Sequence, residues 1–293
     1  MKLRPEHTGL RMDRAITECL SELGQKVSVS EIRKALKDGR IKVNGRLCAP
    51  GARVQVEDAF HLDDFVPKNE WVVKPAPQLL SRTPILYEDE EWLALDKPSG
   101  VHTVPLRNLE EDTLLGAAIA QDIRIANSGP GLEGGALHRL DFGTSGVVLF
   151  AKDPAGRAKV RKAFEKHEII KSYLAVVCDD LSVWNSERTV ELALDTSKKR
   201  VRTDPGGLVS ITHFSPLEHH ESGRTLVKAT TNYGRRHQVR VHLAASGTPI
   251  LGDEVYGQAH PAARLALHAS SLTLPFGLNI RAPVPQDFKD YLK

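Results

Sequence analysis

Residues 138–152 read HRLDFGTSGVVLFAK, which joins a polar loop directly to an apolar segment. The apolar run at 147–150 is typical of a buried strand. In the loop before it, glycines punctuate a turn that carries one carboxylate, Asp141, close to a cation, Arg139. Polar loops anchored to rigid strands often carry chemistry. From these residues alone, Asp141 is either a catalytic carboxylate or an ordinary turn residue, since Asp, Gly, Thr and Ser are all common in turns.

Composition places the chain among globular proteins. Its 293 residues predict two domains. Hydrophobic residues make up 41% and charged residues 26%, and no apolar stretch is long enough to cross a bilayer. The first residues lack the apolar segment of a secretory signal, so we expect a cytoplasmic protein with no membrane partner. The three cysteines lie far apart, and their spacing indicates neither a disulfide framework nor a zinc site.

Positive charge is concentrated near the amino end, although the net charge is only +3. Between residues 31 and 46, six basic residues accompany two acidic ones. We expect a helix here with Ser30 as its N-cap and Gly39 at its end, followed by a hairpin with an Asn44-Gly45 turn. Such a surface could bind phosphates, but a solvated charged face has the same pattern. The candidate phosphate-binding residues are Arg33, Lys34, Lys37 and Arg40.

The middle of the chain predicts a linker, followed by strands and a helix on either side of the Asp141 loop. Residues 65–82 contain three prolines and no periodic pattern, which indicates a linker. Residues 85–96 predict a hairpin, which the string Lys97-Pro98-Ser99-Gly100 follows. Residues 153–167 predict a helix, and residues 169–177 predict a strand that carries Tyr173.

A further helix is predicted within residues 232–249, which read NYGRRHQVRVHLAASGTP. It should begin at residue 235 or 236 and end at residue 247, so that a spacing of four sets Arg236 and Arg240 on one side. Buried arginines would need partners there. His237 and His242 are five residues apart, which does not fit the His-Glu-x-x-His zinc arrangement. We therefore interpret both as structural or RNA-contacting, and we expect no metal site.

These strings together resemble a known family. Residues 138–146 resemble the HRLDxxTSG signature of the RluA-like pseudouridine synthases, and three other segments match that family in the same order. They are the Lys-Pro-x-Gly string at Lys97, the Lys-x-Tyr-x-Ala string around Tyr173, and residues 234–240, which resemble Gly-Arg-Thr-His-Gln-Ile-Arg with Arg236 and Val239 as departures. Residues 9–64 resemble a small RNA-binding module first recognised in a ribosomal small-subunit protein.

The resemblance implies a mixed α+β fold in three parts. These are a small α/β RNA-binding module at 9–64, a linker at 65–82, and a pseudouridine synthase domain at 83–293 with a bent, largely antiparallel central sheet flanked by helices. It implies Asp141 as the nucleophile, Tyr173 as the active-site tyrosine and Arg240 as the guanidinium that keeps the carboxylate charged. The expected substrate- and RNA-binding residues of this domain are His138, Arg139, Thr144, Arg235, Arg236 and Leu267.

The chemistry of uridine isomerisation agrees with these residue types. The bond between C1′ of the ribose and N1 of the base breaks, and C1′ joins C5 instead, so no atoms are gained or lost and we expect no cofactor. A carboxylate can act as nucleophile at the sugar or stabilise electron deficiency there. Tyr173 could stack on the base or remove the C5 proton, but a reference pKa of about 10 favours stacking. Since a base-paired uridine must first be extruded, Arg139 could occupy the space it leaves.

RNA is the expected partner of a monomeric enzyme. The N-terminal module favours large-subunit ribosomal RNA, with tRNA as the alternative substrate. A catalytically inactive RNA-binding or ribosome-assembly factor on the same fold is a rival hypothesis, although binding alone would not require Asp141, Tyr173 and Arg240 together. A hydrolase is disfavoured because Ser145 lies in Thr-Ser-Gly rather than Gly-x-Ser-x-Gly.

Overall fold

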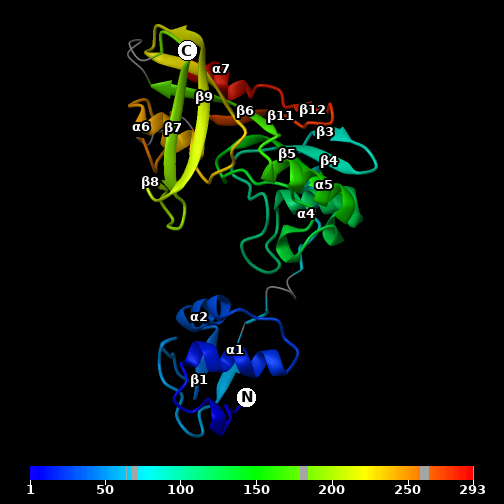
Figure 1. Cartoon of the computed structure of the whole chain (residues 1–293). Helices are drawn as coiled ribbons and strands as arrows, with labels where there is room; N and C mark the ends of the chain where they lie inside the picture. The colour runs from blue at the N-terminus through cyan, green and yellow to red at the C-terminus, as the bar shows by residue number, and fades with distance from the viewer. Residues whose placement is uncertain (64, 68–71, 179–183, 258–263, 293) are drawn as a thin grey trace. The chain divides into compact units, whose positions relative to one another are not determined.

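The computed structural model describes residues 1–63, 65–67, 72–178, 184–257 and 264–292 (Figure 1). It divides into two compact units. One contains residues 1–73 with the short segments 107–109 and 130–132, and the other contains the rest of the chain from residue 74 onward. No helix among the described residues is long and apolar enough to cross a membrane.

The amino-terminal unit is built on two α-helices, one short 3-10 helix and a two-stranded sheet. Its helices are η1 (Pro5–His7), α1 (Met12–Glu22) and α2 (Val29–Lys37), and its strands are β1 (Ile41–Val43) and β2 (Phe60–Leu62), which pair antiparallel. The apolar faces of α1 and α2 pack with both strands into one core. This arrangement of a small α/β unit agrees with the fold expected from the sequence.

One local prediction in this unit needs correction, and another is confirmed. The N-cap of α2 is Ser28 and not Ser30, because the Ser28 hydroxyl accepts from the Glu31 N–H while the Glu31 carboxylate accepts from the Ser28 N–H. The expected Asn44-Gly45 turn is present, with both residues at positive φ. Val43 and Arg46 on either side of the turn exchange two N–H···O=C bonds of 2.9 Å, so the predicted tight hairpin is present, and β1 also pairs along its length with the distant β2.

The second unit contains one large sheet. Within the described residues its strands are β3 (Ile85–Glu88), β4 (Trp92–Lys97), β5 (Ser145–Ala151), β6 (Ile170–Cys178), β7 (Arg188–Asp195), β8 (Arg202–Thr203), β9 (Leu208–His220), β10 (Arg224–Thr231), β11 (Leu267–Thr273) and β12 (Asn279–Arg281). The strand order is β3-β4-β5-β11-β6-β10-β9-β7-β8, and β12 pairs with β11. Only the pairing of β5 with β11 is parallel among those described, so the predicted largely antiparallel sheet is confirmed.

Helices pack against this sheet. They are α3 (Pro77–Leu80), α4 (Leu114–Gln121), α5 (Pro154–Glu165), α6 (Gln238–Ala245) and α7 (Gln286–Leu292), with the short turns η3 (Ile123–Asn127) and η4 (Gly131–Glu133). Helix α5 packs on β5, α6 packs on β7 and β9, and α7 packs on β6 and β10 (Figure 1). The mixed α+β architecture predicted from the sequence is therefore confirmed.

Helix α6 starts later than predicted. Its first residue is Gln238, and His237 before it has a left-handed φ of 56°. Arg236 thus precedes the helix and does not share a helical face with Arg240. The sequence pattern missed this start because no Ser, Thr, Asp or Asn stands at the N-cap position.

The predicted linker also contains structure. Residues 77–80 form α3, where Leu79 is buried, and the Ala76 N–H donates to the carbonyl of Gly116 on α4. Pro77, which indicated a linker, instead occupies the first helical turn, where a missing N–H is tolerated. The second compact unit contains this helix and begins at Lys74. Residues 64 and 68–71 of the predicted boundary lie outside the described residues.

Residues 138–152 contain an interior strand of the sheet, β5, which lies between β4 and β11. All seven residues of β5 are buried, as its apolar run predicts. Gly146 has a φ of 114°, and a Cβ atom there would lie 2.2 Å from the carbonyl oxygen of Ala269 on β11. Glycine at this position therefore lets β5 approach β11 and start its strand immediately after the Asp141 loop.

Candidate active site

The Asp141 loop is held by Lys97, the last residue of β4, and by the turn that follows this strand. The Lys97 side chain is fully buried, and its Nζ donates to the carbonyl oxygens of Pro98, Val101 and Phe142 at 3.0, 2.7 and 3.2 Å. The Gly100 N–H also donates to the Phe142 carbonyl, at 2.8 Å. Burial lowers the pKa of Lys97 to about 7, although the charge of Asp141 opposes this shift. Lys97 therefore fixes the loop through backbone contacts.

Asp141 contacts a guanidinium that comes from α6. Nη1 of Arg240 donates to Oδ2 of Asp141 at 3.0 Å, although 99 residues separate the two in the chain. Nε and Nη2 of Arg240 donate to the two carboxylate oxygens of Asp253, each at 2.8 Å. Arg240 and Asp253 are both buried, whereas the Asp141 side chain is 24% exposed. Burial by itself would lower the pKa of Arg240. The hydrogen bonds and negative charge of Asp253, and after them those of Asp141, outweigh burial and raise this pKa.

Asp253 therefore has an orienting function. Two parallel hydrogen bonds from a planar guanidinium to one carboxylate define the direction of the third donor. That donor points at Asp141, the more accessible of the two acids. Asp253 lies 13 residues beyond Arg240, and spacing in the sequence gave no sign that the two side chains meet.

His237 is a second neighbour of Asp141 that sequence reasoning did not identify. Its Nε2 lies 3.7 Å from Oδ2 of Asp141, and its Nδ1 lies 2.8 Å from the hydroxyl of Tyr256. That hydroxyl also accepts from the Val201 N–H at 2.9 Å. Burial lowers the pKa of His237, and the charge of Asp141 opposes this effect. A Tyr256 hydroxyl that donates to Nδ1 would leave the Nε2 proton directed at Asp141.

Tyr173 lies on β6 and lines the same cleft as Asp141 and Arg240. The cleft has a volume of about 1070 Å³. Burial, and secondarily the negative charge of Asp141, raise the pKa of Tyr173 well above its ordinary value. The ring packs against a core cluster that includes Leu267, which also borders the cleft. The structure thus brings together the three residues predicted to be catalytic.

The other residues predicted in this domain also line the cleft, but their exposure differs. Arg139 and Arg236 are exposed, and Arg235 is partly exposed. Thr144 is only 2% exposed, so its side chain is placed in the loop interior. His138 accepts from the Leu149 N–H at 3.2 Å, and burial lowers its pKa to about 3, so a neutral imidazole holds the loop to β5. Arg33, Lys34, Lys37 and Arg40 belong to the amino-terminal unit.

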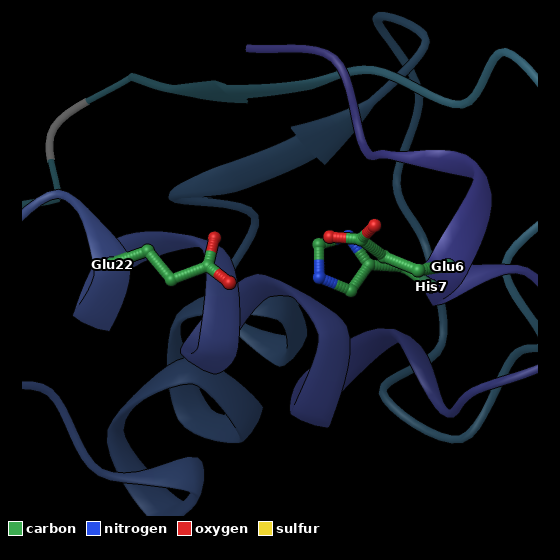
Figure 2. A group of neighbouring side chains, drawn as sticks. All are labelled: Glu6, His7 and Glu22. Atoms are coloured by element: carbon green, nitrogen blue, oxygen red, sulfur yellow. The ribbon is translucent and has the colours of Figure 1, made fainter.

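One group of possible metal ligands occurs among the described residues, and it lies in the amino-terminal unit. Figure 2 shows Glu6 and His7 on η1 facing Glu22 at the end of α1. Arg4 forms ion pairs with both glutamates, and its N–H donates to Nδ1 of His7. Because Arg4 already pairs with both carboxylates, the group does not indicate a metal site.

Both the sequence and the fold are similar to those of known proteins. The sequence model for RNA pseudouridylate synthase matches residues 91–245, and the S4 domain matches residues 19–60. The chain is 28% identical to ribosomal large subunit pseudouridine synthase D of Pseudomonas aeruginosa, over 96% of this chain and 90% of that protein. It is 34% identical to dual-specificity RNA pseudouridine synthase RluA of Yersinia pestis, over 65% of this chain and 91% of that protein. Its structure resembles human RNA pseudouridylate synthase domain containing 1 with a TM-score of 0.57 and 25% identity, over 73% of this chain and 87% of that one.

Proposed function

The chain belongs to the RNA pseudouridylate synthase family, and we propose on this basis that it isomerises specific uridines of large-subunit ribosomal RNA with Asp141 as the nucleophile. The contact between Asp141 and Arg240 at 3.0 Å in the cleft supports this role most directly. A protein that only bound RNA would have no need for a guanidinium aimed at one partly exposed carboxylate. We further propose that it acts in the cytoplasm, as a monomer and without metal or cofactor.

Two similarities support large-subunit ribosomal RNA as the substrate. The relative from Pseudomonas aeruginosa, named for the ribosomal large subunit, aligns over 96% of this chain. The S4 domain match at residues 19–60 adds an RNA-binding unit to the catalytic one. Transfer RNA is the alternative substrate, and the mapping experiment below distinguishes the two.

The proposed reaction begins at the ribose. Arg240 and His237 both approach Oδ2 of Asp141, so we assign Oδ1 as the atom that meets C1′ of an extruded uridine. The C1′–N1 bond breaks, and its electron pair leaves with the uracil, while Asp141 either bonds to C1′ or stabilises its positive charge. Arg240 stays bound to Asp253 throughout and keeps the carboxylate in place.

The base then turns and rejoins the sugar. C5 of the uracil bonds to C1′, the proton at C5 is lost, and N1 gains a proton, so the overall change is an isomerisation. The raised pKa of Tyr173 keeps its hydroxyl protonated, which favours stacking on the uracil over removal of the C5 proton. Arg139, Arg235 and Arg236 line the cleft and would bind the surrounding phosphates.

Chemical mapping of pseudouridine tests this function. Total RNA from cells with and without the gene is compared, and we expect at least one pseudouridine in large-subunit ribosomal RNA to disappear without it. Expression of the unsubstituted protein should restore the site. Asp141→Asn should not restore it, because an amide is a poor nucleophile, and its rate in vitro should fall by at least about 1000-fold with RNA affinity within a few fold.

Asp287→Asn is the matched control for this variant. Asp287 also pairs with an arginine, Arg264, at 2.7 Å, and its side chain is 35% exposed, but it does not line the cleft. The control should restore the pseudouridine. Full activity of Asp141→Asn would eliminate the proposed nucleophile, and a change confined to tRNA would transfer the function to that substrate.

A further inference from the structure

An exposed aromatic ring stands next to the proposed nucleophile. Phe142 follows Asp141 directly, lines the cleft and is 56% exposed. It is the most exposed of the eight phenylalanines, all of which lie in described residues. The next, Phe276, is 37% exposed, stacks on Trp92 with ring centroids 5.1 Å apart and does not line the cleft. An apolar ring left in water inside a functional cleft indicates a ligand surface.

The backbone holds this ring in a defined place. The Phe142 carbonyl accepts from Gly100 N–H and Lys97 Nζ, and the hydroxyl of Ser99 donates to the next carbonyl, that of Gly143, at 2.8 Å. One side of the ring meets the imidazole of His102 edge-on, with centroids 4.8 Å apart and planes at 71°. The ring is therefore preorganised, and little freedom would be lost when a ligand covers its remaining surface.

The chemistry of the substrate indicates what that ligand is. Extruding a uridine breaks its stacking on the neighbouring bases, so one face of a neighbouring nucleobase loses its partner beside the reacting ribose. Aromatic side chains stack on nucleobases of any sequence. A second exposed apolar side chain of the same cleft, Leu106, is 61% exposed and adds to a surface suited to bases more than to phosphates.

We propose that Phe142 is the stacking platform for the nucleobase adjacent to the uridine that Asp141 attacks. This subsite rests on the proposed function, since it places the neighbour of the target base. It assigns Phe142 to substrate positioning and leaves bond making and breaking to Asp141.

Substitutions at Phe142 test whether a ring is required. Phe142→Leu keeps apolar volume without a π face, and we expect the KM for RNA to rise by about 5- to 100-fold. The single-turnover rate at saturating enzyme should change by less than about threefold, because Asp141 and Arg240 remain in place. Phe142→Tyr and Phe142→Trp should restore KM. Phe276→Leu is the control, since it removes an exposed ring outside the cleft, and it should leave KM unchanged.

A second measurement does not depend on turnover. The probe is an unmodified large-subunit ribosomal RNA transcript added to an Asp141→Asn protein that also carries Phe142→Trp. The emission of the new tryptophan, taken as the difference from Asp141→Asn alone, should become protected from acrylamide when RNA binds. Unchanged acrylamide quenching, or a Phe142→Leu protein with the parent KM, would overturn the stacking subsite.

The two proposals fail in different ways. If pseudouridine forms normally while the tryptophan at position 142 stays accessible, only the stacking subsite is wrong. If the tryptophan is protected but no pseudouridine depends on the gene, the proposed function is wrong and the RNA contact remains.

Discussion

At the residue scale, Arg240 defines the geometry of the site because it binds two carboxylates at once. Its bidentate contact with buried Asp253 leaves one donor for Asp141. A lysine could not replace it, since an ammonium is a point donor and cannot hold two acids in a fixed fork geometry. The two carboxylates that Arg240 binds differ in exposure, because Asp253 is fully buried and Asp141 is open to the cleft.

The function of Tyr173 can be tested at the same scale. Its pKa is raised by burial and by Asp141, so the hydroxyl remains protonated in the folded protein. We expect Tyr173→Phe to keep the single-turnover rate within about fivefold, because the ring still stacks on the base. Tyr173→Leu should lose about 100-fold or more. A Tyr173→Phe protein as inactive as Tyr173→Leu would instead identify the hydroxyl as the base.

At the element scale, helix α2 of the amino-terminal unit carries cations with two different functions. Arg33 forms an ion pair with Asp13, which is fully buried and also bound by Arg11, so Arg33 contributes to the fold of the unit. Arg40, just beyond the helix, pairs with Asp38. Lys34 and Lys37 are exposed. Of the four candidates from the sequence, these two lysines are the best placed for RNA phosphates.

The salt dependence of RNA binding tests this assignment. For the double variant Lys34→Ala/Lys37→Ala, we expect weaker binding and a plot of log affinity against log salt that is less steep by about 1.5, as two phosphate contacts are lost. The rate at saturating enzyme should not change. The control is Lys2→Ala/Lys26→Ala, which removes the same charge from exposed positions of the same unit outside α2. An equal change in slope for both variants would mean that only net charge matters.

At the scale of the whole molecule, two buried histidines connect stability to pH. His242 on α6 contacts the Ser210 hydroxyl at 3.0 Å, and His268 on β11 contacts the Ser145 hydroxyl at 2.9 Å. Both side chains are fully buried, and burial lowers the pKa of each to about 4. Below a pH of about 6.5 the unfolded chain binds protons at these sites before the folded protein does, so acid favours unfolding.

We therefore expect the free energy of unfolding to fall as pH decreases from about 6.5 toward 4. Each histidine should contribute about 2 to 3 kcal/mol to this loss, measured by urea unfolding at several pH values. His242→Gln should make the pH dependence shallower. His61→Gln, at an exposed position of the other unit, should leave it as it is. An unchanged pH dependence in His242→Gln would show that this histidine does not couple protonation to folding.

The sequence by itself determined the local structure around the site. The apolar run after Asp141 predicted the buried strand β5, and the spacing around residues 85–96 predicted the β3–β4 hairpin. The resemblance supplied Asp141, Tyr173 and Arg240, which the structure places in one cleft. Two helix starts were predicted wrongly. Helix α6 begins at Gln238 and not at residue 235 or 236, and the N-cap of α2 is Ser28 and not Ser30.

Only the tertiary structure decided which distant residues meet. Asp253 and His237 join Asp141 and Arg240 because the order of strands in the sheet brings α6 and the residues on either side of it to the start of β5. Likewise, the exposure of Phe142 depends on its loop being bound by Lys97, which ends strand β4, and by Gly100 shortly after it. Side-chain periodicity reports one element at a time, whereas these contacts span up to 99 residues and depend on how separate elements pack.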